Sequence, residues 1–490
     1  MHKSGDKIFD CELAILGAGF SGLGAAMALQ KAGFHDLLIF EKAARVGGTW
    51  RENIYPGAAC DVKSIMYSYS YAMNPNWSRV FSPGSEIQTY IEDTAFNAGL
   101  MDRIRFNHAA TALTWEDGGW TLMFAGGKQV RSRFIISALG PLHVPVKPAF
   151  PGADTYQGTI MHSAEWQPDY DVSGKKIAII GSAASAVQIA PAVAQKAARV
   201  TILQRTANWI VPREDAAYRN WQKKLFRLLP FTQRLLRWKI YLMSELRFTA
   251  FRGEDRLFHR FMRHLVVKFM RSQIDDPELR EKIMPDYALG CKRILLSDDY
   301  LACLNRNNVT LETSGIDHIN GSGIVTASGE QIDADLIVLA TGFNPTKMLG
   351  DMVVTGKGGV KLGDQWAAKI QAYRTIHIAN MPNFFMMVGP NSGLGHLSII
   401  FMIEQQARYI TRLMRHMRNH HLSNVSVAPA VENAYNAQLQ TDLKFTIWHS
   451  GCKSWYQDEN GHIFSLWPHR TTRYWWHLRT ASMDQLDFSN

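Results

Sequence analysis

The sequence has few cysteines, and none of them form a close pair. Its 490 residues contain five cysteines, none in a C-x-x-C arrangement: Cys11, Cys60, Cys291, Cys303 and Cys452. This spacing indicates neither a disulfide framework, nor a zinc site, nor a dithiol redox centre. We therefore expect a protein without a metal centre that works in a reducing compartment.

Long apolar runs are also missing. Polar and charged residues dominate the positions before Ile8, so no secretory signal is indicated. Two stretches, 177–195 and 375–403, lack charged residues, but glycine, proline and asparagine or glutamine interrupt both. Such interruptions are typical of buried strands, turns and helices and not of membrane spans. We predict a cytoplasmic protein.

Positive charge is concentrated in one segment. The chain holds 53 Lys and Arg against 43 Asp and Glu, and residues 219–271 alone contain fourteen of these bases and three acids. Apolar residues recur there at helical spacing, so several amphipathic helices are predicted: Leu225, Leu228, Leu229, Leu235, Leu236, Phe258, Phe261, Met262 and Leu265. A basic helical face is most often a solvated surface, and the alternatives are contact with a membrane surface or attraction of an anionic cofactor. Nucleic acid is disfavoured, because no nucleic-acid-binding motif accompanies the charge.

A glycine-rich turn follows the first apolar strand pattern. Residues 11–16 read as a strand, Gly17, Gly19 and Gly22 form a G-x-G-x-x-G turn, and an alanine-rich helical pattern comes next. A second strand pattern ends at Glu41, nineteen residues after Gly22, where a ribose hydroxyl needs an acceptor. Glycines let the backbone approach a pyrophosphate, and the helix N-terminus offers free N–H groups. These four residues therefore predict a dinucleotide site.

The same order of elements returns 164 residues later. A strand pattern at 176–180 precedes a turn that begins at Gly181, and Arg205 stands 24 residues after Gly181, as Glu41 stands 24 residues after Gly17. A carboxylate suits two ribose hydroxyls, whereas a guanidinium beside a hydroxyl suits a 2'-phosphate. We therefore predict FAD in the first unit and NADPH in the second. The predicted NADPH contacts are Gly181, Ser182, Ser185, Gln188, Arg205 and Thr206.

Two alanines depart from the glycine pattern of the second turn. Ala183 and Ala186 replace its middle and last glycines. The methyl group of Ala183 is expected near the pyrophosphate, so weaker NADPH binding or a shifted loop follows from it. The alternative is a degenerate domain that serves only as a scaffold.

The repeated pattern predicts an α/β fold with two dinucleotide-binding, Rossmann-like domains and a helical insertion in the second. The length allows about three domains. We assign the FAD-binding domain to residues 1–149 and 344–490 and the NADPH-binding domain to 150–212 and 285–343. The basic helices at 213–284 are the predicted insertion.

The segment between the two units carries a longer motif. Tyr156, Gly158, His162 and Trp166 follow the pattern aromatic-x-Gly-x-x-x-His-x-x-x-Trp. In this motif the chain resembles the class I Baeyer-Villiger monooxygenases, which belong to the flavin-containing monooxygenase superfamily. The resemblance extends over nearly the whole chain. Trp166 favours the Baeyer-Villiger branch, because the heteroatom-oxidising relatives usually lack tryptophan there. We expect His162 to act on conformation and not in the chemistry.

A second family motif lies after the first unit. It consists of Gly47, Gly48, Thr49 and Trp50, then Tyr55-Pro56-Gly57, then Asp61. The resemblance implies that Gly48, Thr49, Trp50 and Asp61 contact the cofactor, with Trp50 over the flavin ring. By the same resemblance Tyr67 lies beside the flavin.

Two further segments match the family. Lys292 and Arg293 resemble its paired basic residues, which implies that Lys292 helps to hold the 2'-phosphate and that Arg293 faces the flavin. Ser454-Trp455-Tyr456 implies that Trp455 lies near the nicotinamide. Residues 389–404, with His396, are expected near the flavin and the substrate.

The resemblance implies a reaction. NADPH reduces FAD, oxygen adds at carbon 4a, and the peroxyflavin inserts one oxygen atom next to a ketone carbonyl to give an ester or lactone. We expect Arg293 and Asp61 to be catalytic, because a buried anion needs a positive partner and that partner needs an orienting carboxylate. Sulfide or amine oxygenation is the close alternative. A scaffold or peripheral membrane flavoprotein that binds FAD without turnover is the alternative of another class. The sequence leaves the natural ketone and the oligomeric state open.

Overall fold

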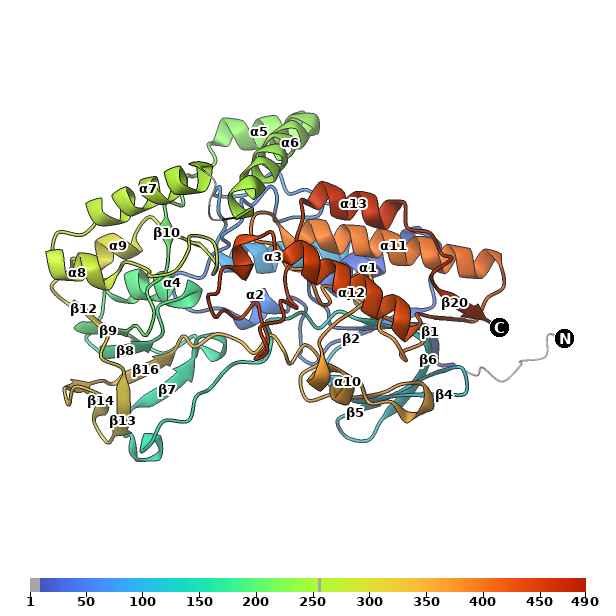
Figure 1. The fold of residues 1–490 in the computed structure, drawn as a ribbon, viewed down its shortest axis with the longest axis horizontal. Helices are drawn as coiled ribbons and strands as arrows, with labels where there is room; N and C mark the ends of the chain where they lie inside the picture. Colours follow the sequence, from blue (N-terminus) through green and yellow to red (C-terminus); the bar gives the residue numbers. More distant parts are fainter. Residues whose placement is uncertain (1–8, 254–256) are drawn as a thin grey trace.

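The computed structural model describes residues 9–253 and 257–490 as an α/β protein with two main sheets (Figure 1). The first sheet has the order β17-β4-β5-β6-β1-β2-β3, and β18 also pairs with β6. Strands β1, β2, β3, β6 and β18 pair in parallel with one another, and β17 pairs in parallel with β4. Strand β5 is antiparallel to both of its neighbours, β4 and β6. The strands are β1 (Cys11–Leu16), β2 (Leu37–Phe40), β3 (Ile104–Arg105), β4 (Ala110–Glu116), β5 (Gly119–Phe124), β6 (Gln129–Ser137), β17 (Val353–Thr355) and β18 (Phe384–Met386).

The second main sheet is parallel throughout, with the order β12-β9-β8-β16-β7. Its inner strands are apolar runs that are buried on both faces, as parallel sheets require. The strands are β7 (Thr159–His162), β8 (Lys176–Ile180), β9 (Arg199–Leu203), β12 (Val309–Glu312) and β16 (Leu336–Leu339). A small antiparallel sheet and two strand pairs complete the strands: β13 (Ile316–Asn320), β14 (Gly323–Thr326), β15 (Gln331–Asp333), β10 (Ile210–Val211), β11 (Leu295–Leu296), β19 (Asn424–Ser426) and β20 (Asp487–Ser489).

Helices cover both sheets, and long helices from distant parts of the chain lie together. The N-terminal helix α1 packs against α11 near the C-terminus, and α11 packs against α13. The helices are α1 (Phe20–Lys31), α2 (Thr49–Glu52), α3 (Gly84–Asn97), α4 (Ala184–Val193), α5 (Asn220–Leu228), α6 (Pro230–Arg247), α7 (Leu257–Ser272), α8 (Pro277–Lys282), α9 (Tyr300–Cys303), α10 (Leu362–Ala368), α11 (Ile399–Asn419), α12 (Pro429–Leu443) and α13 (Thr471–Arg479). The α/β class with Rossmann-like units is therefore confirmed.

Two connections join the regions of the main sheets, and they run side by side. The amide of Val146 donates to the carbonyl of Gly342 at 2.9 Å, and the amide of Asn344 donates to the carbonyl of Val144 at 2.9 Å. The paired connections place the end of β6 and the end of β16 at the same junction. The domain boundaries drawn from the sequence stay a prediction.

The basic segment is helical, as expected. Helices α5, α6, α7 and α8 lie between β10 and β11 in the chain, and α5 and α6 stand at the top of the view in Figure 1. No helix within residues 9–253 and 257–490 is long and apolar enough to cross a membrane.

Candidate active site

The first glycine turn leaves no room for a side chain where α1 meets β1. A Cβ atom at Gly22 would lie 1.9 Å from the carbonyl oxygen of Gly17. The helix therefore starts directly over the end of the strand, and its first N–H groups face the space beyond the sheet. This is the close approach that a dinucleotide pyrophosphate needs.

Glu41 follows β2, and hydrogen bonds hold its carboxylate in place. Only 3% of the residue is exposed. Its Oε2 accepts from the amide of Ala18 at 2.8 Å, and its Oε1 accepts from the amide of Ala43 at 3.0 Å and from Arg51 at 2.8 Å. The carboxylate is thus fixed beside the turn and carries a compensating cation, as a buried charge requires.

An aromatic pair lies against the same turn. The indole N–H of Trp50 donates to the hydroxyl of Tyr67 at 3.1 Å, and the Tyr67 ring meets that of Phe20 edge-on at 5.2 Å. Gly48, with φ of 55°, brings this segment against the turn, since a Cβ atom there would lie 3.3 Å from the Cα of Gly19. The short helix α2 that follows includes Thr49 and Trp50. The structure therefore places Gly48, Trp50 and Tyr67 around the first turn.

The second turn repeats the backbone of the first. Ala183 has φ of −89° and ψ of −158°, and Gly19 has φ of −89° and ψ of −167°. Because this conformation is open to any residue, the alanine does not strain the turn. The methyl of Ala186 is fully buried at the position that matches Gly22. The second turn is therefore looser at this point than the first.

The second turn is also closed by hydrogen bonds to the loop between β9 and β10. The hydroxyl of Ser182 donates to the carbonyl of Thr206 at 3.1 Å, and the side-chain amide of Asn208 donates to the carbonyl of Ser182 at 3.0 Å. These contacts bring Gly181 and Thr206 into one cluster, as the sequence predicts.

Arg205 and Lys292 meet beside this turn although 87 residues separate them. Arg205 is exposed, and Lys292 is half-buried with its ammonium 4.5 Å from the centre of the Tyr287 ring. Burial lowers the pKa of Lys292, Asp286 opposes this effect, and the charge of Arg205 lowers the pKa further. Two neighbouring cations that solvent can reach suit a phosphate group.

Gln188 has a different position from the one predicted. Its side-chain oxygen accepts from the hydroxyl of Tyr55 at 3.0 Å, and its side-chain nitrogen donates to the carbonyl of Ala59 at 2.9 Å. Its amide therefore joins α4 to the segment after the first turn instead of facing the space above the second. Ser185 lies half-buried on α4 near the Tyr55 hydroxyl.

Arg293 and Asp61 form the ion pair that the sequence proposes. The Nε of Arg293 donates to Oδ2 of Asp61 at 3.0 Å, and a terminal nitrogen of the guanidinium contacts the same oxygen. The side chains of Arg293 and Asp61 are 40% and 26% exposed, so the pair borders solvent. The charge of Asp61 raises the pKa of Arg293, and burial opposes this. The guanidinium therefore stays charged beside Asp61.

The sequence patterns assigned no role to two residues of this region. Tyr456 is 3% exposed, and burial raises its pKa to about 12, with the charge of Arg293 opposing the rise. Arg51 holds Glu41 and completes the first turn. Each follows a predicted residue in the chain, Trp455 and Trp50, and that adjacency was the only signal. Trp455 is 39% exposed, and its ring packs on that of Tyr456 at 4.6 Å.

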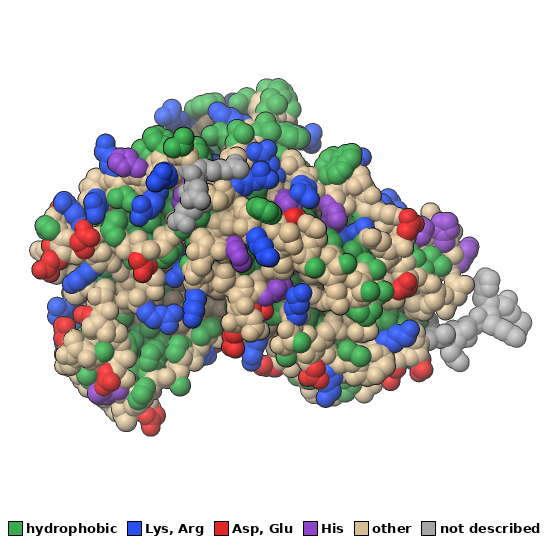
Figure 2. Space-filling model, in the orientation of Figure 1, with side chains coloured by type: hydrophobic (Ala, Val, Ile, Leu, Met, Phe, Trp, Pro, Cys, Tyr) green, Lys and Arg blue, Asp and Glu red, His purple; other side chains and the backbone are tan. Residues whose placement is uncertain are grey.

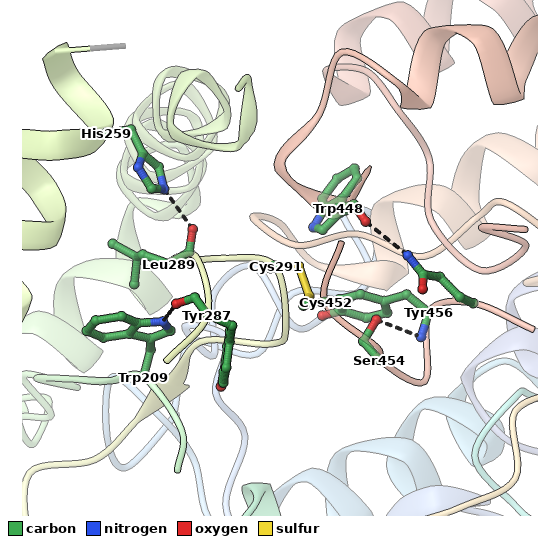
Figure 3. Close-up of a disulfide and its surroundings, with 10 residues drawn as sticks. Trp209, His259, Tyr287, Leu289, Cys291, Trp448, Cys452, Ser454 and Tyr456 are labelled. Atoms are coloured by element: carbon green, nitrogen blue, oxygen red, sulfur yellow. Dashed lines mark hydrogen bonds between the residues drawn. A yellow bond between two sulfur atoms is a disulfide. The ribbon is translucent and has the colours of Figure 1, made fainter. Parts of the chain in front are cut away.

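A disulfide links Cys291 to Cys452 (Figure 3). The expectation of a chain without disulfides was therefore wrong. The two cysteines are 161 residues apart, and sequence spacing does not show that their Cα atoms lie 6.4 Å from each other. The bond ties the loop of Lys292 and Arg293 to the segment of Trp455, and it packs beside the buried rings of Phe251 and Trp448. One cross-link thus joins the segments that carry three predicted site residues, Lys292, Arg293 and Trp455.

The linker motif consists of residues that fix the connection between the units. Nδ1 of His162 accepts from the amide of Ala164 at 3.1 Å, and Nε2 donates to the carbonyl of Gly342 at 3.1 Å. Burial lowers the pKa of His162, and the hydrogen bond to Gly342 opposes this. The hydroxyl of Tyr156 donates to the carbonyl of Ala334 at 2.8 Å.

Gly158 and Trp166 complete the linker motif. A Cβ atom at Gly158 would lie 2.4 Å from the hydroxyl of Tyr156, and Trp166 packs in the core under the second sheet. These contacts favour a conformational role for the motif.

His396 lies in a different cluster from the Arg293 pair. Its Nε2 lies 3.3 Å from Oε1 of Glu245 on α6, and its side chain is buried. Burial raises the pKa of Glu245, but hydrogen bonds from His396, Thr471 and Thr472 outweigh this and lower the pKa to about 2. The cluster therefore fastens α6 to the body of the protein.

The chain is similar to known oxidoreductases over almost its entire length. A family model described as pyridine nucleotide-disulphide oxidoreductase matches residues 14–228. A protein of Pseudomonas aeruginosa named Baeyer-Villiger monooxygenase is 39% identical over 95% of this chain and 89% of its own length.

This chain belongs to the Baeyer-Villiger monooxygenase family.

Solved structures have the same fold. A structure described as OTEMO complex with FAD and NADP has a TM-score of 0.90 and 24% identity, and covers 99% of this chain and 100% of its own. One described as oxidized steroid monooxygenase bound to NADP has a TM-score of 0.87 and 27% identity, and covers 98% of this chain and 99% of its own. The predicted family, fold class and enzyme class of this Baeyer-Villiger monooxygenase are confirmed.

Proposed function

We propose that this chain uses NADPH, O₂ and FAD to insert one oxygen atom next to a ketone carbonyl, giving an ester or lactone. Its family membership supports the reaction. The observation that carries the proposal within the molecule is the Arg293–Asp61 pair, which joins a loop of the second unit to the segment after the first turn.

The two turns fit the two cofactors. FAD supplies the oxygen-activating chemistry and NADPH the hydride when both are bound. Gly17, Gly19, Gly22 and the fixed carboxylate of Glu41 would hold FAD, with Trp50 and Tyr67 beside it. Arg205, Thr206 and Lys292 would hold the 2'-phosphate of NADPH.

Arg293 would stabilise the negative charge that develops on the ketone oxygen during attack at the carbonyl carbon. A unit charge pair at about 4 Å contributes on the order of 4 kcal/mol at an effective dielectric near 20. Asp61 orients the planar guanidinium through Nε and a terminal nitrogen, which leaves the other donors free for the substrate. Asp61 is thus a positioning residue for Arg293.

The reaction is tested with labelled oxygen and a panel of ketones and sulfides. Mass spectrometry should find one atom from ¹⁸O₂ in each ester, with NADPH consumed in equal amount. Sulfoxides without esters would assign the chain to heteroatom oxidation. No NADPH-dependent product from any substrate would contradict an oxygenase and favour a scaffold flavoprotein.

Arg293→Ala tests the residue assignment. Loss of about 4 kcal/mol corresponds to oxygenation about a thousandfold slower, with NADPH ending mainly in hydrogen peroxide. The ratio of ester formed to NADPH consumed measures this coupling. Arg293→Lys should recover only part of it, because a point charge does not reproduce the planar fork. Near wild-type coupling in a folded, FAD-containing Arg293→Ala protein would make Arg293 an ordinary ion-pair residue.

A further inference from the structure

Helix α6 points its polar side inward. A polar stripe at every fourth residue faces the protein: Gln233, Arg237, Tyr241 and Glu245. The side-chain amide of Gln233 donates to the carbonyl of Asn74 at 2.7 Å, and Oε1 of Glu245 accepts from the amide of Thr471 at 3.0 Å. Leu236 and Ile240 also pack against the core, so hydrogen bonds and a narrow apolar contact fasten the helix together.

The opposite side of α6 is apolar and faces outward. This apolar face of α6 consists of residues spaced by three or four positions: Phe231, Leu235, Trp238, Leu242 and Leu246. Between 55% and 65% of each residue is exposed. Five large side chains on one outward stripe form a contiguous apolar surface, and a monomeric soluble protein rarely leaves such a surface in water.

The neighbouring helices extend this surface. Trp221 and Leu228 on α5 are 60% and 66% exposed, and Leu257 and Phe261 on α7 are 83% and 58% exposed. Figure 2 shows hydrophobic side chains gathered over α5 and α6 at the top of the view, with Lys and Arg side chains around them.

Positive charge surrounds the apolar face of α6. Exposed bases occur along all three helices, among them Lys224, Arg234, Lys239, Arg247, Arg260 and Lys268. Within 219–253 and 257–271, only Arg271 forms an ion pair with an acid, Glu281. The one acid described in this segment, Glu245, is buried on the inner side of α6. Apolar side chains ringed by unpaired bases are typical of helices that lie in a membrane interface.

We propose that α5, α6 and α7 dock this monooxygenase onto the surface of an anionic lipid bilayer. The apolar face of α6 enters the boundary between headgroups and acyl chains, and the surrounding bases contact lipid phosphates. A second copy of the chain is a poorer occupant, because it would bring like charges together around the apolar contact. Since no helix in the described part of the chain can span a bilayer, the contact is peripheral.

Vesicle pelleting of the full-length, FAD-containing protein tests the proposal. The protein should pellet with vesicles of phosphatidylcholine and phosphatidylglycerol and much less with phosphatidylcholine alone. Arg234→Glu with Lys239→Glu should weaken binding to the anionic vesicles roughly thirtyfold, since each lost base contributes about a factor of five. Lys357→Glu with Lys361→Glu, which changes exposed bases far from these helices, should bind like wild type.

A second pair of variants tests the apolar contribution. Trp238→Ser and Leu242→Ser should each weaken binding roughly tenfold or more, because each removes a side chain that the bilayer would bury. Phe96→Ser is the matched control, since Phe96 is 74% exposed on α3. Unchanged flavin content would show that each variant is folded.

Three outcomes would overturn the proposal. The protein could stay in solution with anionic vesicles, or the control variants could lose as much binding as the test variants. A dimer in sedimentation that Trp238→Ser dissociates, without vesicle binding, would assign the surface to a second copy. Pelleting does not depend on turnover, so a failure here is separate from a failure of the proposed ketone oxidation.

Discussion

The two glycine turns share a backbone but differ in how they hold the residue that stands 24 positions after their first glycine. Glu41 is 3% exposed and accepts three hydrogen bonds from the turn and from Arg51. Arg205, at the same offset in the second unit, is exposed to solvent. A fixed, buried acceptor favours a ligand that stays, whereas a solvated cation favours one that enters and leaves. The comparison supports the proposal that the first turn holds FAD and the second holds NADPH.

Of the substitutions that compare the two turns, Gly22→Ala at the last position of the first turn is expected to have the largest effect on cofactor affinity. In Gly22→Ala the new Cβ would meet the carbonyl oxygen of Gly17 at 1.9 Å, so α1 must move. A cost of about 3 kcal/mol would lower FAD affinity about a hundredfold. Ala186→Gly changes no such contact and should destabilise α4 by only about 1 kcal/mol. Flavin content and thermal unfolding of both variants measure the difference, and equal effects would contradict a tighter first turn.

Sequence patterns predicted the parts of this comparison that are local. Each turn lies within six consecutive residues after an apolar strand, so Gly17 and Gly181 could be found from spacing alone. Contacts between distant parts of the chain could not be predicted from spacing. Asp61 and Arg293 are 232 residues apart, and only the family resemblance connected them.

Periodicity also left one question open. It identifies residues that share a helix face, such as Leu235 and Leu242, but not whether that face packs inward. The polar partners of α6, including Asn74 and Thr471, come from distant segments, so periodicity alone does not predict that its polar stripe faces the protein.

A disulfide joins the Lys292 loop of the second unit to the C-terminal segment of the chain, and breaking it should have the next largest effect. Cys452→Ser removes the bond to Cys291 and frees the loop of Lys292. Loss of a disulfide that closes a long loop costs about 2 to 4 kcal/mol. Thermal unfolding should report this loss, and NADPH affinity should fall while FAD content stays constant.

A control for the disulfide uses a cysteine outside the cross-link. Cys303→Ser removes a buried free thiol and should leave NADPH affinity unchanged. Mass spectrometry of alkylated peptides should find Cys291 and Cys452 protected from alkylation until a reductant is added. Alkylation of both in the untreated protein would contradict the cross-link.

Removal of the exposed Arg205 guanidinium tests whether the second turn prefers NADPH to NADH. Arg205→Ala loses charged hydrogen bonds to the 2'-phosphate worth about 1.5 to 3 kcal/mol, so NADPH should bind about ten- to a hundredfold more weakly. NADH, which lacks this phosphate, should hardly change. Arg199→Ala, at an exposed base that begins β9, is the matched control. Equal losses for both nucleotides would remove Arg205 from the phosphate site.

The smallest effect is expected at the middle position, where the two turns have the same backbone angles. Ala183 is exposed at the N-terminus of α4, and we expect its methyl group to lie near the NADPH pyrophosphate. Ala183→Gly should therefore tighten NADPH binding by less than about 1 kcal/mol, or roughly threefold, without a change in unfolding temperature. The reciprocal change, Gly19→Ala, places a Cβ atom 3.6 Å from the Cα of Gly48, which the protein accommodates. Any loss of FAD in that variant then comes from the methyl group meeting the cofactor. If titration shows Ala183→Gly binding NADPH more weakly, the methyl group is a contact and not an obstacle, and the second turn holds its ligand differently from the first.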